Sequence, residues 1–244
     1  MGYIFAFIVF IILGIAVAIS QMMSVGKLEK EKLIPVLDSL YANPKTNQKH
    51  QLFIANLKYL DELIKKYEGD SFSYNPSNVI VEKLFRHINK YPNDRLGHER
   101  FMELISRAKQ LSSEYLFQKL LFQIKTDATP LDHERLSACV IKARFLSENL
   151  LEPLLDYLER DQNNPLVQQH FLQMAMQIML LSETKRQRIY NISLQILERN
   201  PHKTSAKKFV LNVGRWHFGK SRENGRITIY DEQRIQNDIL ARMA

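Results

Sequence analysis

An apolar segment near the start of the chain, residues 3–20, limits what this protein can be more than any other feature. It contains no charged residue and almost nothing polar. As a helix it would be about 27 Å long, close to the thickness of a bilayer's hydrocarbon core. We therefore expect a single transmembrane helix over residues 1–22. The residues expected to span the membrane are Tyr3, Ile4, Phe5, Phe7, Ile8, Val9, Phe10, Ile11, Ile12, Leu13, Ile15, Val17 and Ile19.

A cleaved signal peptide is the alternative interpretation of this segment. Ala16-Val17-Ala18 resembles a small-residue cleavage site. However, Met1 and Gly2 provide no basic side chain, and the apolar run is longer than a signal peptide usually needs. We favour a retained anchor, and an exported soluble helical domain stays as the alternative.

The flanking charges predict how the anchor is oriented. Lys27, Lys30 and Lys32 follow the apolar segment, and no Lys or Arg precedes it. The flank of a transmembrane helix that carries the excess of Lys and Arg lies on the cytoplasmic side of the membrane. The single cysteine, Cys139, excludes an intrachain disulfide and agrees with a reducing compartment. We expect a single-pass membrane protein whose soluble part is cytoplasmic.

The rest of the chain has the periodicity of helices. Prolines and polar clusters separate the apolar stripes and mark helix boundaries. The pattern predicts an all-α protein with a juxtamembrane helix or linker at 23–44 and a helical-repeat domain at 45–218. A basic turn and a C-terminal amphipathic capping helix are expected at 219–244. The apolar stripes are Phe53/Leu57/Leu60/Ile64/Tyr67, Ile80/Leu84/Ile88, Phe101/Leu104/Ile105/Ala108/Leu111, Leu116/Leu120/Ile124, Leu136/Val140/Ala143, Leu150/Leu151/Leu154/Leu155/Leu158 and Leu194/Leu197.

Two segments repeat each other at the residue level. His98-Glu99-Arg100 recurs 35 residues later as His133-Glu134-Arg135. Pro130, Pro165 and Pro201 follow a similar spacing of 35 and 36 residues. A period in the mid-thirties, filled by two helices and two turns, is typical of a helical solenoid. An ordinary irregular helical domain is the alternative.

The segments Asp161-Gln-Asn-Asn-Pro165 and Asn200-Pro201-His202 resemble the turn that joins consecutive tetratricopeptide repeats. Residues of about 45–218 therefore resemble an α-solenoid of the tetratricopeptide type or of the HEAT and armadillo type. This resemblance implies a concave surface that holds another protein or a peptide. Catalysis is unusual among such families, so we expect that the protein is not an enzyme.

One segment, Gly214–Ser221, satisfies the phosphate-loop pattern G-x-x-x-x-G-K-[ST]. Such a loop needs a strand before it and a packed helix after it, and the polar residues that follow Ser221 have no apolar face. We expect instead that Phe209, Val213 and Trp216 form the buried stripe of a helix that Gly219 ends. Nucleotide binding stays as an alternative function.

No other motif predicts catalysis or metal binding. His98 and His133 each precede a glutamate, but neither has a second histidine four residues later. Cys139 lies on an apolar helix face and is expected in the core. We expect no catalytic residue, no cofactor and no metal site.

The positive charge is concentrated near the C-terminus. Of the net charge of +8, residues 203–226 contribute seven cations and one anion, around Trp216. Such a cluster fits an acidic protein partner, anionic lipid headgroups, RNA, or merely a solvated helix end. No nucleic-acid-binding motif accompanies it, so nucleic acid is the least favoured partner. The predicted partner-binding residues are Lys203, Lys207, Lys208, Arg215, Trp216, Lys220, Arg222 and Arg226.

The last residues predict two short elements. Gly225–Tyr230 alternates like an extended segment, and Asp231 then opens a helix with Ile235, Ile239 and Met243 on one side. We expect this helix to cap the open end of the repeat, with docking of a partner as the alternative. Together these features predict a membrane-anchored scaffold or assembly factor. The sequence does not identify the oligomeric state, the membrane or the partner.

Overall fold

The computed structural model describes residues 26–44, 46–68, 75–127, 129–220 and 226–243. The predicted transmembrane helix, with all its spanning residues, lies outside these ranges. Within them, no helix is both long enough and apolar enough to cross a bilayer.

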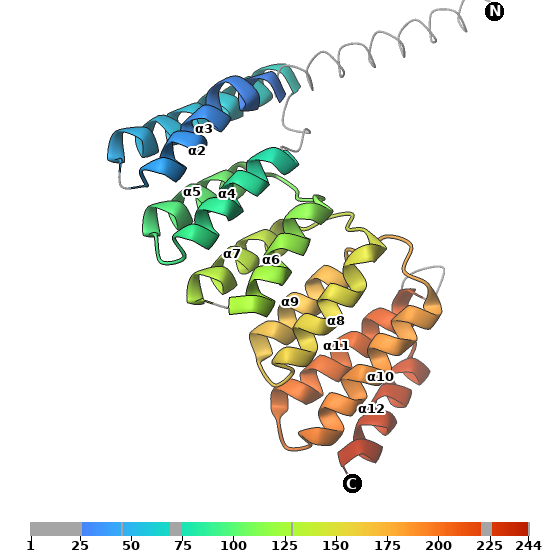
Figure 1. Ribbon diagram of the computed structural model, residues 1–244. Coiled ribbons are helices and arrows are strands. Elements are labelled where there is room, and N and C mark those ends of the chain that lie inside the picture. The colour runs from blue at the N-terminus through green and yellow to red at the C-terminus, as the bar shows by residue number, and fades with distance from the viewer. Residues whose placement is uncertain (1–25, 45, 69–74, 128, 221–225, 244) are drawn as a thin grey trace, which may run out of the picture. The chain divides into compact units, whose positions relative to one another are not determined.

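The expected all-α class is confirmed. The described parts of the chain form eleven α-helices and no strand (Figure 1). Each apolar stripe predicted from the sequence is buried wherever its side chains are described. The chain divides into two compact units, Met1–Leu116 and Phe117–Ala244, and the boundary falls in the first turn of a helix.

Unit 1 contains two stacked pairs of helices. After the short π-helix η1 (Glu29–Leu33), α2 (Ile34–Ala42) packs against α3 (Asn47–Glu68), and α4 (Asn78–Lys90) packs against α5 (Arg95–Arg107). Between the pairs, α2 contacts α4 and α3 contacts α5. The first helices of the two pairs therefore form one layer, and the second helices form another.

Unit 2 also contains pairs of packed helices. The helices are α6 (Glu114–Asp127), α7 (Pro130–Lys142), α8 (Leu151–Arg160), α9 (Pro165–Ala175), α10 (Glu183–Arg199), α11 (Thr204–Lys220) and α12 (Ile229–Met243), with the 3-10 turn η3 (Glu148–Leu150) before α8. α8 pairs with α9 and α10 with α11, while α7, α9 and α11 contact one another in sequence as one layer (Figure 1). This stacking of hairpins is consistent with a helical repeat.

Prolines and capping side chains set the helix boundaries, as the sequence predicts. Pro130 and Pro165 are the first residues of α7 and α9. Proline suits this position because its missing N–H would have no partner inside the helix. Before them, the side chains of Thr129 and Asn164 accept hydrogen bonds from backbone amides in the first turn.

The repeated His-Glu-Arg segments bury their arginines. Arg100 and Arg135 are each 1% exposed. Arg100 donates to Asp94, the N-cap of α5, at 3.1 Å. Arg135 donates at 2.6 Å to Asp132, which forms a capping box with Thr129 at the start of α7. Each arginine therefore neutralises a carboxylate at a helix N-terminus, and the sequence repeat has a counterpart in structure.

The C-terminal helix begins earlier than expected. α12 starts at Ile229, so Ile229 and Tyr230 are helical rather than extended. The reason is a reciprocal cap, in which Asp231 accepts hydrogen bonds from the amide and hydroxyl of Thr228 and donates its own amide to that hydroxyl. Ile235 and Ile239 are buried, and α12 packs against both α10 and α11.

Candidate partner-binding surface

The predicted basic residues do not form one patch, because α11 separates them into two groups. Lys203, Lys207 and Lys208 lie at or just before its first turns, and Lys220 is its last residue. Lys208 and Lys220 are about 18 Å apart along the helix axis at about 1.5 Å per residue. Arg222 lies outside the described residues, and Arg226 is exposed before α12.

Arg215 has a structural partner. Its Nε donates to a carboxylate oxygen of Glu232 at 2.8 Å, which links α11 to α12. Both side chains are partly exposed, so the pair adds at most about 1 kcal/mol. Arg215 therefore supports the packing of α12 and offers less free charge to a partner.

The buried stripe of α11 is confirmed. Phe209, Val213 and Trp216 are 4%, 0% and 8% exposed. Gly219 does not end the helix, which continues to Lys220.

All of the phosphate-loop pattern except Ser221 lies within α11, and Ser221 lies outside the described residues. Residues 214–220 are helical, so their amide groups face along the helix axis and do not form a loop that could surround a phosphate. Gly214 has a packing role, since a Cβ there would lie 2.9 Å from two side-chain carbons of Ile235.

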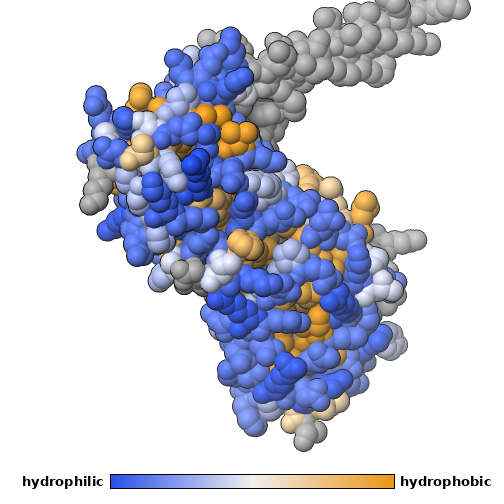
Figure 2. Space-filling view, in the orientation of Figure 1, coloured by the Kyte–Doolittle hydropathy of each residue, from blue (hydrophilic) through white to orange (hydrophobic). Residues whose placement is uncertain are grey.

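A surface formed by two connections stands out in unit 2. The residues after α7 and after α9 are joined by two backbone hydrogen bonds, from Leu146 N to Gln177 O at 2.8 Å and from Met179 N to Leu146 O at 3.0 Å. Large apolar side chains project from both segments. Phe145, Met176, Met179 and Leu180 are 58%, 46%, 52% and 95% exposed, and we call them the apolar loop surface. Figure 2 shows hydrophobic residues, in orange, at several places on one mainly hydrophilic face of the protein.

Two members of this surface have an unusual backbone. Phe145 and Leu180 have φ values of 55° and 57°. This left-handed region costs an L-residue about 1–2 kcal/mol and is normally occupied by Gly or Asn. An exposed Leu in this conformation adds nothing to the core, and retained strain of this kind clusters at functional sites.

A small cleft lies beside the apolar loop surface and reaches Trp216. It has a volume of about 190 Å³ and is lined by Met176, Ile178, Leu180, Leu181, Arg186, Trp216 and Lys220. We call it the Trp216 cleft. The indole Nε1 of Trp216 is buried and meets no hydrogen-bond acceptor among the described residues. Leaving such a donor unpaired costs about 1–3 kcal/mol.

The helices behind the cleft are packed through aromatic rings. His217 stacks on Tyr190 with ring centroids 5.9 Å apart, and Phe218 meets the edge of Tyr190 at 5.6 Å. Burial, together with the nearby Arg186, lowers the pKa of His217. The ring is therefore neutral at physiological pH, and the side of α11 behind the cleft carries no charge from His217.

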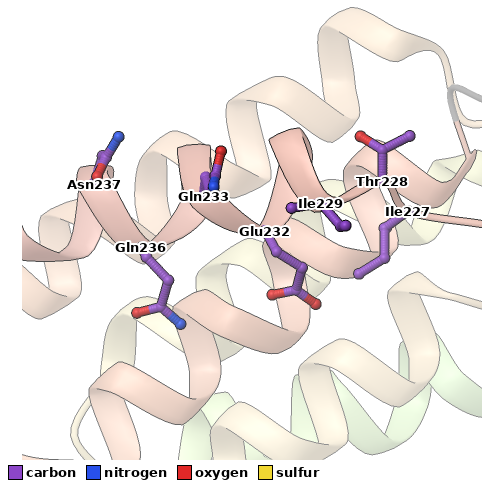
Figure 3. A pocket seen from close by; sticks show the side chains of 7 residues that line it. All are labelled: Ile227, Thr228, Ile229, Glu232, Gln233, Gln236 and Asn237. Carbon is purple, nitrogen blue, oxygen red and sulfur yellow. The ribbon is translucent and has the colours of Figure 1, made fainter.

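A second hollow, of about 440 Å³, lies along the start of α12. Its lining residues are Ile227, Thr228, Ile229, Glu232, Gln233, Gln236 and Asn237 (Figure 3). Figure 3 shows Glu232 and Gln236 extending from the same side of the helix. It is an open surface whose one charged side chain is already held by Arg215.

The groups that could bind metal or act as a nucleophile are dispersed or buried. Within the described ranges, no three His, Cys, Asp or Glu residues are close enough to hold a metal ion. Cys139 is fully buried, and burial raises the pKa of its thiol, so it is part of the core as expected.

Comparison with known proteins identifies no relative of this chain. A scan against protein-family models, a search of curated proteins and a search of solved structures each found no match.

Of the residues that line the cleft, Trp216 and Lys220 are predicted from the sequence and the others are not. The available signal was the run Met176–Leu181, which has five apolar residues in six positions and no helical stripe. A run of this kind outside a predicted helix would have indicated an exposed apolar connection.

Proposed function

We propose that this protein is a non-enzymatic, membrane-anchored helical-repeat protein that binds a protein partner at the cytoplasmic surface of a membrane. The apolar segment 3–20 would supply the anchor, and the stacked hairpins, of a tetratricopeptide or armadillo type, would supply the binding scaffold. Anchoring would raise the local concentration of the partner, as in a scaffold or assembly factor.

The observation that carries this proposal is the apolar loop surface. Its four apolar side chains are about half exposed or more, and two have a strained backbone. Exposed apolar groups that gather at one place mark interaction sites in soluble domains. Both contributing segments connect consecutive helices, where repeat proteins carry binding residues without disturbing the stacked core.

Crosslinking of the full chain in cells, followed by affinity purification from membranes, tests the proposal. We expect Leu180→Asp to reduce recovery of a crosslinked protein by about ten-fold or more, because it places charge in an apolar contact. Ile229→Asp is the matched control, since Ile229 is also apolar and 76% exposed but lies on α12. Equal recovery with both variants would contradict the assignment of the surface.

The lysines at the start of α11, Lys203, Lys207 and Lys208, need a separate test. Lys207→Glu combined with Lys208→Glu reverses charge far from the Trp216 cleft. If these lysines contact an acidic partner or anionic lipid, we expect recovery to fall and to depend on salt concentration. Recovery that resists both changes would mean that this group is simply a solvated helix end.

The membrane location is tested by alkaline carbonate extraction of isolated membranes. A retained anchor keeps the full chain in the membrane pellet. Release of a chain shortened near Ala18 would contradict the anchor and support the exported alternative.

A further inference from the structure

The Trp216 cleft indicates what kind of partner segment would bind. Four of its lining side chains, Met176, Ile178, Leu180 and Leu181, are apolar and come from one connection. Leu180 is the most exposed of the large hydrophobic residues described. An occupant with an apolar side chain would therefore cover the surface that is least favourable in water.

An apolar group alone would not complete this cleft. Trp216 lines it and is 8% exposed, yet its indole N–H has no acceptor among the described residues. Buried polar groups are almost always paired, and an indole N–H can only donate. The occupant should thus bring an oxygen acceptor as well as an apolar side chain.

The charged residues of the cleft select the kind of acceptor. Arg186 and Lys220 both line it, and none of the seven lining residues is acidic. Arg186 donates to the Leu181 carbonyl at 2.5 Å, which holds its guanidinium at the wall. A carboxylate is the acceptor that best complements two cations and an N–H donor.

The size of the cleft favours one side chain of a protein partner over a small molecule as the occupant. Its 190 Å³ is smaller than the about 300–1,000 Å³ of typical small-molecule sites. It suits one anchoring side chain of a larger partner, as at the centre of many protein interfaces.

We propose that the Trp216 cleft binds a segment of a partner protein in which one leucine-sized apolar side chain is next to an acidic side chain. The apolar side chain enters between Leu180 and Trp216, and the carboxylate lies over Arg186 and Lys220. This inference rests on the proposed function and specifies its recognition chemistry.

A pair of short synthetic peptides tests the inference with the full chain in phosphatidylcholine vesicles. One peptide has a leucine flanked by aspartates among glycines and serines, and the other has asparagines in place of the aspartates. Trp216 is the only tryptophan in the chain, so its emission reports on the cleft directly. We expect the acidic peptide to shift this emission at saturation and to bind at least about ten-fold more tightly than its neutral match.

Two variants locate the binding site. Lys220→Glu should lower the affinity for the acidic peptide by about ten-fold or more, while the affinity for the neutral peptide should change little. Lys203→Glu reverses the charge at the other end of α11 and should change the affinity for either peptide by less than about two-fold. Equal affinity for the two peptides, or equal effects of the two variants, would overturn the inference. Binding to phosphatidylserine vesicles that Lys220→Glu abolishes, without peptide selectivity, would also overturn it in favour of lipid.

Failure of this inference can be distinguished from failure of the proposed function. If a crosslinked protein is lost with Leu180→Asp but recovered fully with Lys220→Glu, partner binding stands and the acidic specificity is wrong. If no protein is crosslinked above background, the proposed function itself fails.

Discussion

The hydroxyl of Tyr157 lies 3.1 Å from Nδ1 of His170. Ser137 Oγ lies 2.9 Å from the other ring nitrogen and donates its own hydrogen to the His133 carbonyl at 2.8 Å. Because that hydrogen is used, Nε2 of His170 must be the donor to Ser137, and Nδ1 accepts from Tyr157. The buried imidazole is therefore held neutral between α7, α8 and α9.

This arrangement predicts loss of stability in acid. Burial, with a smaller effect from His133, lowers the pKa of His170 from 6.5 to about 4. Between these values the unfolded chain binds a proton that the folded chain does not, so the free energy of unfolding falls as pH falls. We expect a loss of about 1–2 kcal/mol from this residue between about pH 6.5 and pH 5.

Urea unfolding of His170→Gln at both pH values measures this contribution. The variant should lose less stability on acidification than the wild type. The matched control is His202→Gln, because His202 is exposed in the turn before α11. Identical pH dependence for wild type and His170→Gln would contradict the expected role.

The buried ion pair in unit 1 should be far more sensitive than an exposed one. Asp94→Ala leaves Arg100, which is 1% exposed, without its carboxylate. Removing one partner of a buried pair costs about 3–5 kcal/mol. Asp156→Ala breaks the pair between Lys125 and Asp156, which are 64% and 52% exposed, and should cost under about 1 kcal/mol.

Chemical denaturation with urea measures both effects. Combining Asp94→Ala with Arg100→Met should recover much of the loss, because no buried charge then remains unpaired. Similar losses for Asp94→Ala and Asp156→Ala would show that the burial of Arg100 is not energetically important.

Gly214 is predicted to be required for close packing of α12. In Gly214→Ala the new Cβ would lie 2.9 Å from Ile235 and 3.1 Å from Tyr190. Overpacking costs about 1–3 kcal/mol, and the better helix propensity of Ala returns up to about 1 kcal/mol. We therefore expect net destabilisation of about 1 kcal/mol, measured by thermal unfolding.

Two further variants test the cause. Ile235→Val removes one of the two carbon atoms in close approach, so it should partly rescue Gly214→Ala. Gly26→Ala is the matched control, since nothing lies within 4 Å of a Cβ at that position. If Gly214→Ala has the stability of the wild type, α12 adjusts its position without loss of stability.

The helical conformation of residues 214–220 predicts no nucleotide site at this segment. Titration of the full chain with a magnesium nucleotide should show no saturable binding. Saturable binding that is lost in Lys220→Ala would contradict this expectation and revive the nucleotide alternative.

The fold was predictable because its signals are local. Apolar spacing such as Phe53/Leu57/Leu60 and first-turn prolines such as Pro130 depend on only a few neighbouring residues. The alternation of Ile227 and Ile229 with Arg226 and Thr228 predicts an extended segment, and so it puts the start of α12 after Tyr230 rather than at Ile229. The Thr228 and Asp231 side chains, three positions apart, were the stronger signal.

The candidate site was less predictable because it depends on contacts between distant segments. Trp216 and Lys220 stood out by residue type, but the separation of the lysines along α11 follows from the length of that helix. The left-handed backbone of Phe145 and Leu180 has no sequence signal, since neither is Gly or Asn. The sequence does not predict the buried roles of Arg100 and Arg135, because arginine usually lies at the surface.

The hydrogen bonds between Leu146 and the residues flanking Ile178 have a consequence for affinity. They hold two connections, about thirty residues apart in sequence, in one fixed arrangement before any ligand arrives. Ordering a loop upon association consumes binding energy, and here most of that ordering is completed when the chain folds. A short contact segment could therefore bind with useful strength, because little conformational entropy would be lost on the side of the receptor.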